Sequence, residues 1–418
     1  MEANHRWLVG IDWASQEHPG CLLDEAGEVI GERVVAHTGE GLAELCAWLE
    51  ATTRAPAGVI EVAIEVPHGA VVDALLERGF RVYAINPKQL DRFRDRFTVA
   101  GAKDDRRDAR VLADSLRTDA HCYRELEQDS AQIIQLRELS RMLEDLQQDR
   151  VELSNRLRQQ LRRCFPQMLE LTQDLAAGWF LDLWQLIPTP AKARHVRASS
   201  IDRLLKKHRI WKLSGADVLE TLRAQPLTLA AGTVTAATTH IGALSARIGL
   251  VNEQVRTCQR NMDQLLAELA APSEAAPGKG CEQRDVTILH SLPGVGRVVI
   301  ATLLAEASQP LRSRDYHALR ALCGTAPVTR QSGRRRVVGM RKACNARLRN
   351  ALYHWARVAT QHDPRSHDRY AALRQRGCSH GRALRSVSDR LLAVACSMLR
   401  SQTLFDPSRA LSTGAEAA

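Results

Sequence analysis

The chain has 418 residues, of which 44% are hydrophobic and 25% charged, with a net charge of +10 and a pI of about 9.3. This composition is typical of a soluble globular protein with two or three domains, and the charge favours a polyanionic partner. No apolar run reaches the length of a membrane span, no signal-peptide pattern is present, and the ten cysteines form no Cys-x-x-Cys pair. We therefore expect no membrane association, zinc site or disulfide framework, and we expect a location in the reducing cytoplasm.

The N-terminal part alternates strand and helix patterns. Strands are predicted at residues 6–12, 19–24, 28–36, 59–65 and 80–85, and helices at 39–51, 69–78 and 104–117. Three early strands followed by helices alternating with further strands is the order of an RNase H-like (RuvC-like) α/β fold. We place this domain at residues 1–122.

Four carboxylates of this region are candidates for one metal site. Asp12 and Glu65 each end an apolar strand pattern, and Asp105 and Asp108 are three residues apart on a predicted helix, so they share one face. Oxygen ligands in this number suit Mg²⁺ or Mn²⁺, which promote phosphodiester chemistry. For any one of these acids taken alone, a surface or capping role is the more common one.

The middle part, residues 123–271, is predicted to be helical. Within residues 126–165, leucines recur with a spacing of three or four residues. A longer apolar row occupies nine successive a and d positions at 241–269. The longer row favours a coiled coil, within one chain or between chains, and an ordinary helical bundle is the alternative. Residues 166–232 show short helices without a chemical motif.

The C-terminal part follows a linker at residues 272–280, rich in Pro and Gly, and it is strongly basic. Residues 1–100 contain 9 Lys or Arg and 16 Asp or Glu, a net charge of −7, whereas residues 311–418 contain 21 and 6, a net charge of +15. We expect a mostly α-helical nucleic-acid-binding domain at 281–400 and a flexible tail at 401–418. The alternative for the basic residues is a solvated surface.

Two local motifs lie in this basic part. The turn Leu292-Pro293-Gly294-Val295-Gly296 precedes a predicted helix at 297–307, and it resembles a helix-hairpin-helix turn that offers N–H groups to a phosphate, although such turns also only cap helices. Ser332 is followed by Gly333 in a loop with four arginines: Arg330, Arg334, Arg335 and Arg336. A serine held against a phosphate is a binding hydroxyl or a nucleophile, and the residues alone favour binding.

Together these stretches resemble the DEDD-type insertion-sequence transposases, which join a RuvC-like N-terminal domain to a C-terminal domain that carries a serine. The resemblance covers nearly the whole chain, and its specificity lies in the order of several modest matches. These are residues 10–12, 63–65, 102–109, 292–296, 324–327, 332–333, 342–345 and 348–352.

The resemblance implies that Asp12, Glu65, Asp105 and Asp108 bind Mg²⁺ or Mn²⁺ and that Ser332 forms a serine–phosphate intermediate. It also implies a structured guide RNA from the element, donor and target DNA as partners, and a homo-oligomer, a dimer or tetramer joined through the coiled coil, in the bacterial nucleoid. We expect nucleic-acid contacts from Arg330, Gly333, Arg334, Arg335, Arg336, Lys342, Asn345 and Arg349.

Three positions depart from the family pattern. Asp104 stands where a small hydroxyl residue is usual, so Asp104 and Asp108 form a rival pair of ligands. Cys344 replaces a glycine and Thr325 a leucine, which changes local packing only.

Two other classes of protein remain as alternatives. A RuvC-like structure-specific endonuclease would use Ser332 only to bind phosphate. A nucleic-acid-binding protein without catalysis would have no use for four clustered acids.

Overall fold

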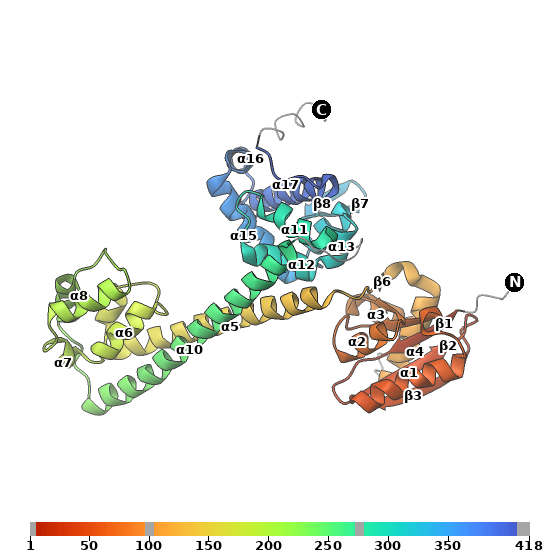
Figure 1. The fold of residues 1–418 in the computed structure, drawn as a ribbon, viewed down its shortest axis with the longest axis horizontal. Coiled ribbons are helices and arrows are strands. Elements are labelled where there is room, and N and C mark those ends of the chain that lie inside the picture. Colours follow the sequence, from red (N-terminus) through yellow and green to blue (C-terminus); the bar gives the residue numbers. More distant parts are fainter. Residues whose placement is uncertain (1–5, 97–103, 272–279, 408–418) are drawn as a thin grey trace. The chain divides into compact units, whose positions relative to one another are not determined.

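The computed structural model describes residues 6–96, 104–271 and 280–407, which form two compact units, Met1–Ser130 and Ala131–Ala418 (Figure 1). Of the linker predicted at 272–280 and the tail predicted at 401–418, residues 272–279 and 408–418 lie outside the described residues. The boundaries of the three predicted domains stay predictions.

The first unit is an α/β domain built on a six-stranded mixed sheet with the strand order β3-β2-β1-β4-β5-β6. Its strands are β1 (Trp7–Ile11), β2 (Glu17–Leu23), β3 (Val29–Ala36), β4 (Ile60–Ile64), β5 (Arg81–Ala84) and β6 (Arg124–Glu125). Its helices are α1 (Gly39–Thr53), α2 (Ala70–Glu77), α3 (Pro87–Arg94) and α4 (Asp105–Asp119), with short 3₁₀ turns η1 (Ala57–Val59) and η2 (Ala120–Cys122). This arrangement fits the predicted RNase H-like fold, and α3 and β6 are additions to the predicted elements.

The alternation of side chains along β1 explains how the sheet is covered. Val9 and Ile11 face a core that includes α1 and α2, whereas Leu8 belongs to the core formed with α3 and α4. β1 runs parallel to β4 and antiparallel to β2. Because both faces are covered, β1 and β4 are apolar throughout most of their length, as buried parallel strands usually are.

Helix α4 lies unusually close to β1, and Gly10 is the reason. A Cβ atom built on Gly10 would lie 1.9 Å from the Ala109 carbonyl oxygen and 2.6 Å from the Ala113 nitrogen. A residue with any side chain would push the helix away from the strand. The glycine therefore fixes the distance of α4 from the end of β1, where Asp12 follows.

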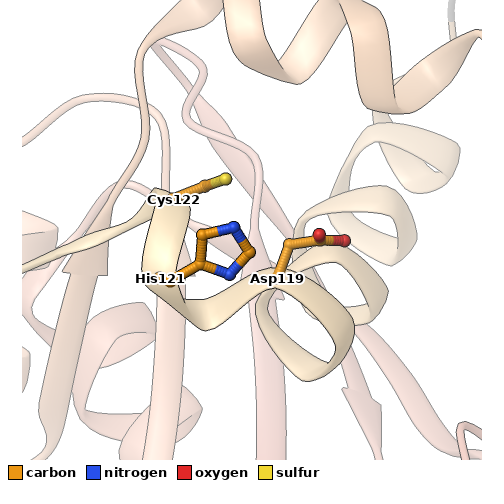
Figure 2. A group of neighbouring side chains, drawn as sticks. All are labelled: Asp119, His121 and Cys122. Atoms are coloured by element: carbon orange, nitrogen blue, oxygen red, sulfur yellow. The ribbon is translucent and has the colours of Figure 1, made fainter.

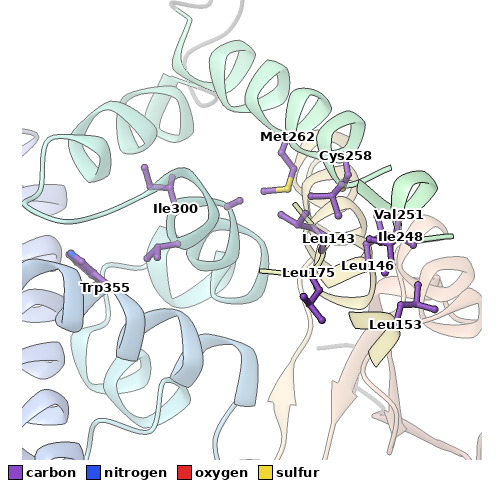
Figure 3. Packing of buried hydrophobic residues seen from close by; sticks show 14 of the residues in the cluster. Leu143, Leu146, Leu153, Leu175, Ile248, Val251, Cys258, Met262, Ile300 and Trp355 are labelled. Atoms are coloured by element: carbon purple, nitrogen blue, oxygen red, sulfur yellow. The ribbon is translucent and has the colours of Figure 1, made fainter. Parts of the chain in front are cut away.

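The second unit is organised by two long helices, α5 (Ala131–Cys164) and α10 (Ala231–Ala270). They run antiparallel (Figure 1), and the Cys258 thiol in the second half of α10 lies 3.2 Å from the Leu139 carbonyl oxygen in the first half of α5. The predicted apolar row of α10 is buried, and Ile248 and Met262 pack in the same core as Leu143 and Leu153 of α5 (Figure 3). The apolar row of α10 is thus covered by α5 of the same chain, and a coiled coil between chains stays a prediction.

Two further groups of elements complete the second unit (Figure 1). The first comprises η3 (Pro166–Glu170), α6 (Gly178–Leu186), α7 (Pro190–Ala193), α8 (Ala198–Lys207) and α9 (Gly215–Leu222). The second comprises α11 (Gly280–His290), α12 (Arg297–Glu306), α13 (Ser308–Arg312), α14 (Tyr316–Leu322), the hairpin β7 (Val328–Ser332) and β8 (Arg335–Gly339), α15 (Ala346–His362), α16 (Pro364–Gln375) and α17 (His380–Ser401). The C-terminal part is mostly α-helical, as predicted. Within the described residues, no helix has the length and apolar character needed to cross a membrane.

Candidate active site

Asp12 and Glu65 lie at the same edge of the sheet in the first unit. Parallel strands β1 and β4 pair in register up to Ile11 and Ile64, and the two acids are the next residues of their strands. Both are partly buried. The Asp12 backbone N–H donates to the Pro19 carbonyl at 3.0 Å, which holds the chain at this point against the start of β2.

Asp108 adds a third carboxylate from the first turn of α4. Its side chain is buried, and Arg94 of α3 binds it through two bonds, Nε to Oδ1 at 2.6 Å and Nη2 to Oδ2 at 2.7 Å. Burial would lower the pKa of Arg94, but the hydrogen bonds and charge of Asp108, with the charges of Asp91 and Glu65, outweigh it and raise that pKa. Arg94 therefore lies in the field of both Asp108 and Glu65.

Asp104 and Asp105, at the start of α4, are exposed and have different local roles. The Asp104 carboxylate caps the helix, accepting a bond from the Arg106 backbone N–H at 3.3 Å. An N-cap favours Ser, Thr, Asp or Asn, so Asp104 can take the place of the hydroxyl residue that the family usually has here. Asp105 begins the helix and lies one turn before Asp108 on the same side. Metal binding by Asp104 and Asp108 would take the Asp104 carboxylate away from the helix cap, whereas binding by Asp105 and Asp108 leaves the cap intact.

A hard divalent cation fits the chemistry of Asp12, Glu65, Asp105 and Asp108, whose donors are all carboxylate oxygens. The four do not form a closed cluster in this conformation. Among the described residues, only Asp119, His121 and Cys122 place three ligand atoms within 4.8 Å of one another (Figure 2). That group lies at the opposite end of α4, and the Asp119 carboxylate is already bound by Arg96 at 3.0 Å and Thr118 at 2.7 Å.

Ser332 lies in the second unit, at the tip of the hairpin formed by β7 and β8. It pairs with Arg335, and Gly333 has a φ of +56°, the left-handed conformation that suits a glycine at the first central position of a two-residue turn. The whole tip is exposed. Within the described part of the chain, no group hydrogen-bonds the Ser332 hydroxyl.

The hairpin register separates the surrounding arginines. Residues directly opposite each other in a ladder share a face, and side chains alternate along a strand. Arg335 and Arg330 therefore lie on the Ser332 face, whereas Arg336, which pairs with Gln331, lies on the opposite face. The sequence alone does not distinguish these arginines.

The base of the hairpin is held by two half-buried carboxylates. Asp389 of α17 accepts a bond from the Thr325 hydroxyl at 3.0 Å and a two-point contact from Arg320 at 3.1 and 2.7 Å. Glu306, at the end of α12, accepts a bond from the Asn345 amide at 3.0 Å and one from Arg141 at 3.1 Å. The Thr325 departure from the family pattern thus supplies a hydrogen bond at the hairpin base.

Glu306 remains charged in this environment. Burial would raise the pKa of Glu306, but the Arg141 hydrogen bond and charge, with Asn345 and the charge of Arg347, outweigh it and lower that pKa. The Arg347 Nε lies 3.2 Å from the same carboxylate. Glu306 therefore ties α5, α12 and α15 together.

Four residues of the predicted nucleic-acid surface or its neighbouring motif have clear places in the fold. The Asn345 side-chain oxygen caps α15, accepting from the Arg347 and Leu348 N–H groups, so both ends of its amide are used internally. Lys342 is exposed, and Arg349 is half-buried. At the turn before α12, Gly294 has a φ of +71° and packs so closely that a Cβ there would lie 2.6 Å from the Ala359 nitrogen. That turn serves packing against α15, and the nucleic-acid contacts stay predictions.

The sequence patterns do not identify Arg94, Glu306 or Asp389. Each lies in an ordinary charged stretch, and only its partner in the fold reveals its role. The spacing of Asp108 from Asp105 is a signal that the sequence does carry. For Arg94, the available signal is its place in a run of charged residues shortly before those acids.

Known proteins match both parts of the chain. A family model described as transposase, of the DEDD type of IS110, matches residues 9–166, and one described as transposase IS116/IS110/IS902 family matches residues 286–371.

Three curated relatives are similar over different lengths. "Mini-circle putative transposase for IS117" of Streptomyces coelicolor is 32% identical over 417 residues, which cover 98% of each chain. A protein of insertion element IS116 from Streptomyces clavuligerus is 27% identical over 414 residues, 97% of this chain and 98% of the relative. "Putative transposase y4uE" of Sinorhizobium fredii is 59% identical over 211 residues, which cover 50% of this chain and 59% of that protein.

Proposed function

Because the chain belongs to the IS110/IS116 family of DEDD-type transposases, we propose that it cuts the DNA of its insertion sequence and rejoins it to a target. The observation that supports this most is the convergence of Asp12 and Glu65 at one sheet edge, with Asp108 of α4 bound to an arginine that also lies in the field of Glu65. A fold with no catalytic role would gain little by placing Asp12 and Glu65 at the ends of neighbouring strands, since like charges repel.

The metal ligands in this proposal are Asp12, Glu65, Asp105 and Asp108. A bound Mg²⁺ or Mn²⁺ ion would supply positive charge to the oxygens of the reacting phosphodiester. Arg94 neutralises Asp108 in the metal-free protein and keeps α3 and α4 together, so the carboxylate is already positioned. DNA and RNA binding would come from the basic second unit.

Ser332 is the proposed nucleophile. Its Oγ attacks the phosphorus atom, an Oγ–P bond forms, and the P–O bond to a deoxyribose hydroxyl breaks, while the serine proton passes to solvent or to the leaving oxygen. A hydroxyl of the second strand then attacks the same phosphorus and releases the serine. Arg330 and Arg335, on the Ser332 face of the hairpin, would bind the phosphate oxygens during both steps.

The family resemblance also leads us to propose that an element-encoded RNA guides the reaction and that several copies assemble on the DNA. The serine and the acids belong to different units, and the hairpin carries no base within reach of Ser332, so activation must come from elsewhere. A shared site within an assembly of copies would supply it.

The same exposed, unassisted serine favours a second candidate, a RuvC-like structure-specific endonuclease in which Ser332 only binds phosphate. A denaturing gel with labelled donor and target DNA, guide RNA and Mg²⁺ separates the two. We expect a wild-type band that survives denaturant and maps to Ser332, and no such band with Ser332→Ala.

Thr329→Ala is the matched control, because Thr329 is an exposed hydroxyl residue on the opposite face of the same strand. It should form the adduct at the wild-type level. Undiminished cleavage by Ser332→Ala, without an adduct in either protein, would establish the endonuclease.

A further inference from the structure

A pocket of about 350 Å³ lies at the base of the serine hairpin, within the second unit. Arg349, Asn350 and Tyr353 of α15 form one side and Arg385 of α17 another. Thr325, just before β7, and Met340, just after β8, close it on the hairpin side. The pocket is thus joined to both ends of the hairpin that carries Ser332.

Two of the arginines in this pocket have no carboxylate partner among the described residues. The Arg349 Nη1 lies 3.8 Å from the Cys344 thiol, and the Arg385 Nη1 lies 3.1 Å from the Met340 thioether, both weak acceptors. By contrast, Arg347 at the same pocket is paired with Glu144 and Glu306. The pocket therefore has two uncompensated positive charges on half-buried side chains.

The aromatic side chain of Tyr353 lines the same pocket as these two arginines. Tyr353 is 37% exposed, so part of its ring is open to a ligand. His380 packs edge-on against Tyr353 with ring centroids 6.3 Å apart, and the Tyr370 hydroxyl bonds the His380 Nδ1 at 2.8 Å. These contacts support the Tyr353 side chain. The neighbouring Asn350 amide is exposed and offers both a donor and an acceptor.

We infer that this pocket binds one unpaired nucleotide of a nucleic-acid strand, with its phosphate between Arg349 and Arg385 and its base against Tyr353. The inference rests on the proposed function, and it names a ligand for residues that the function does not need for chemistry. The volume is at the lower end of the range for small-molecule sites and suits a single nucleotide. Guanidinium groups bind phosphate oxygens, and an aromatic face stacks any base.

The position of the pocket gives the bound nucleotide an anchoring role. From Val328 to Ser332 the strand rises by about 13 Å at the usual rise per residue. The phosphate in the pocket and the phosphate at Ser332 are therefore different groups. A base inside a duplex stack is not free to enter the pocket, so the site selects a displaced or single strand over paired DNA.

Binding of a fluorescent single-stranded oligonucleotide, compared with a duplex of the same sequence at fixed salt, tests the inference. The full-length variant Arg349→Gln with Arg385→Gln should bind the single strand at least about tenfold more weakly, because both guanidinium contacts to the phosphate are lost. Tyr353→Leu should lose at least about tenfold as well, since one stacked base contributes about this much. Tyr353→Leu should leave duplex binding within about twofold, since no base of the duplex reaches that ring.

The matched control is Arg374→Gln with Arg382→Gln, which removes the same charge from exposed arginines outside the pocket. Equal losses in the control and the pocket variant would overturn the inference, as would equal losses of single-strand and duplex binding by Tyr353→Leu. Arg385→Lys keeps the charge and should recover part of the affinity. No recovery, in a variant with an unchanged circular dichroism spectrum and melting temperature, would count against phosphate binding.

Competition identifies the source of the phosphate. A free deoxynucleoside monophosphate should displace the oligonucleotide at lower concentration than inorganic phosphate does, and equal potency would overturn the role of the base. The outcome is independent of the catalytic proposal. A wild-type protein that forms no serine–phosphate adduct but keeps the pocket selectivity refutes only the chemistry, and the reverse result refutes only the pocket.

Discussion

Arg94 and Asp108 form a two-point ion pair with guanidinium–carboxylate distances of 2.6 and 2.7 Å. Asp108 is only 2% exposed, so its charge is balanced inside the protein before any metal ion binds. A cation that takes Asp108 as a ligand must compete with this arginine or share the carboxylate with it. The pair therefore links folding of the first unit to metal binding.

Replacing Arg94 should reveal that link. Arg94→Gln leaves a buried carboxylate without its cation, which should lower the free energy of unfolding by about 3 kcal/mol in the absence of metal. Mg²⁺ would restore the balance, so the rise in melting temperature on adding Mg²⁺ should be larger in Arg94→Gln than in the wild type. Thermal unfolding with and without Mg²⁺ at about 10 mM measures both effects.

Arg92→Gln is the control, since Arg92 is an exposed arginine of the same helix. It should match the wild type in both conditions. An equal Mg²⁺ response in the wild type and Arg94→Gln would show that Asp108 is not a metal ligand.

The close packing of β1 and α4 makes a second prediction. Gly10→Ala places a methyl group where the Ala109 carbonyl oxygen lies 1.9 Å away, so α4 must move. Overpacking of this kind costs about 3 kcal/mol, and the shift should also carry Asp108 away from Asp12. Gly20→Ala, at a buried glycine whose nearest neighbour would be 3.6 Å away, should cost far less. Urea unfolding of the two variants that shows equal losses of stability would contradict the close approach.

How far the sequence predicts these features depends on the range of the interaction. The apolar character of residues 6–12 and 59–65 reports local burial, so the predicted strands that end at Asp12 and Glu65 agree with β1 and β4 within a residue or two. Their adjacency follows from parallel pairing, which sequence spacing does not encode. The Arg94 side chain meets Asp108 across 14 positions, in a contact that only the packing of α3 on α4 creates.

The second unit shows the same limit. The apolar row of α10 predicts a helical seam, but it does not say whether the partner is another copy or α5 of the same chain. Helix α5 fills the seam, because the chain between the two helices folds back. The sequence predicts a loop at Ser332 and misses the hairpin, since its strands are short, mostly exposed and without a regular alternation of apolar and polar residues.

Because His18 is buried, we expect the free energy of unfolding to depend on pH. The Ala14 N–H donates to His18 Nδ1 at 3.4 Å, so the neutral ring donates through Nε2 to His37 Nδ1 at 2.8 Å. Burial, and then the charge of His37, lower the pKa of His18 below its usual 6.5. The unfolded chain thus takes up a proton at higher pH than the folded one.

The stability that the neutral ring contributes is fully present above pH 6.5 and is lost as the pH falls through the lower folded value, by at most about 1.4 kcal/mol per pH unit. Urea midpoints at pH 7.5 and 5.5 should therefore differ less in His18→Gln than in the wild type. His68→Gln, which alters an exposed histidine of the same unit, should keep the wild-type pH dependence. A wild-type response in His18→Gln would assign the effect to other groups.

The two faces of the hairpin lead to the last prediction. Arg335 pairs with Ser332 and shares its face, whereas Arg336 pairs with Gln331 on the other face, and both side chains are exposed. Each contributes one positive charge, so Arg335→Gln and Arg336→Gln should flatten the salt dependence of DNA binding by the same amount, up to about 0.9 log units for each phosphate that is no longer neutralised. Binding alone should not distinguish the two variants.

The serine–phosphate adduct should distinguish them. If Arg335 stabilises the phosphate at Ser332, Arg335→Gln should lower the rate of adduct formation about a hundredfold at saturating DNA, the usual loss for one donor to a developing negative charge. Arg336→Gln should change that rate less than about threefold, because its side chain points away from the reacting phosphate. Single-turnover gels at saturating DNA provide the rates. Equal losses in both variants would mean that the hairpin acts only through its total charge, and that the serine face has no special role.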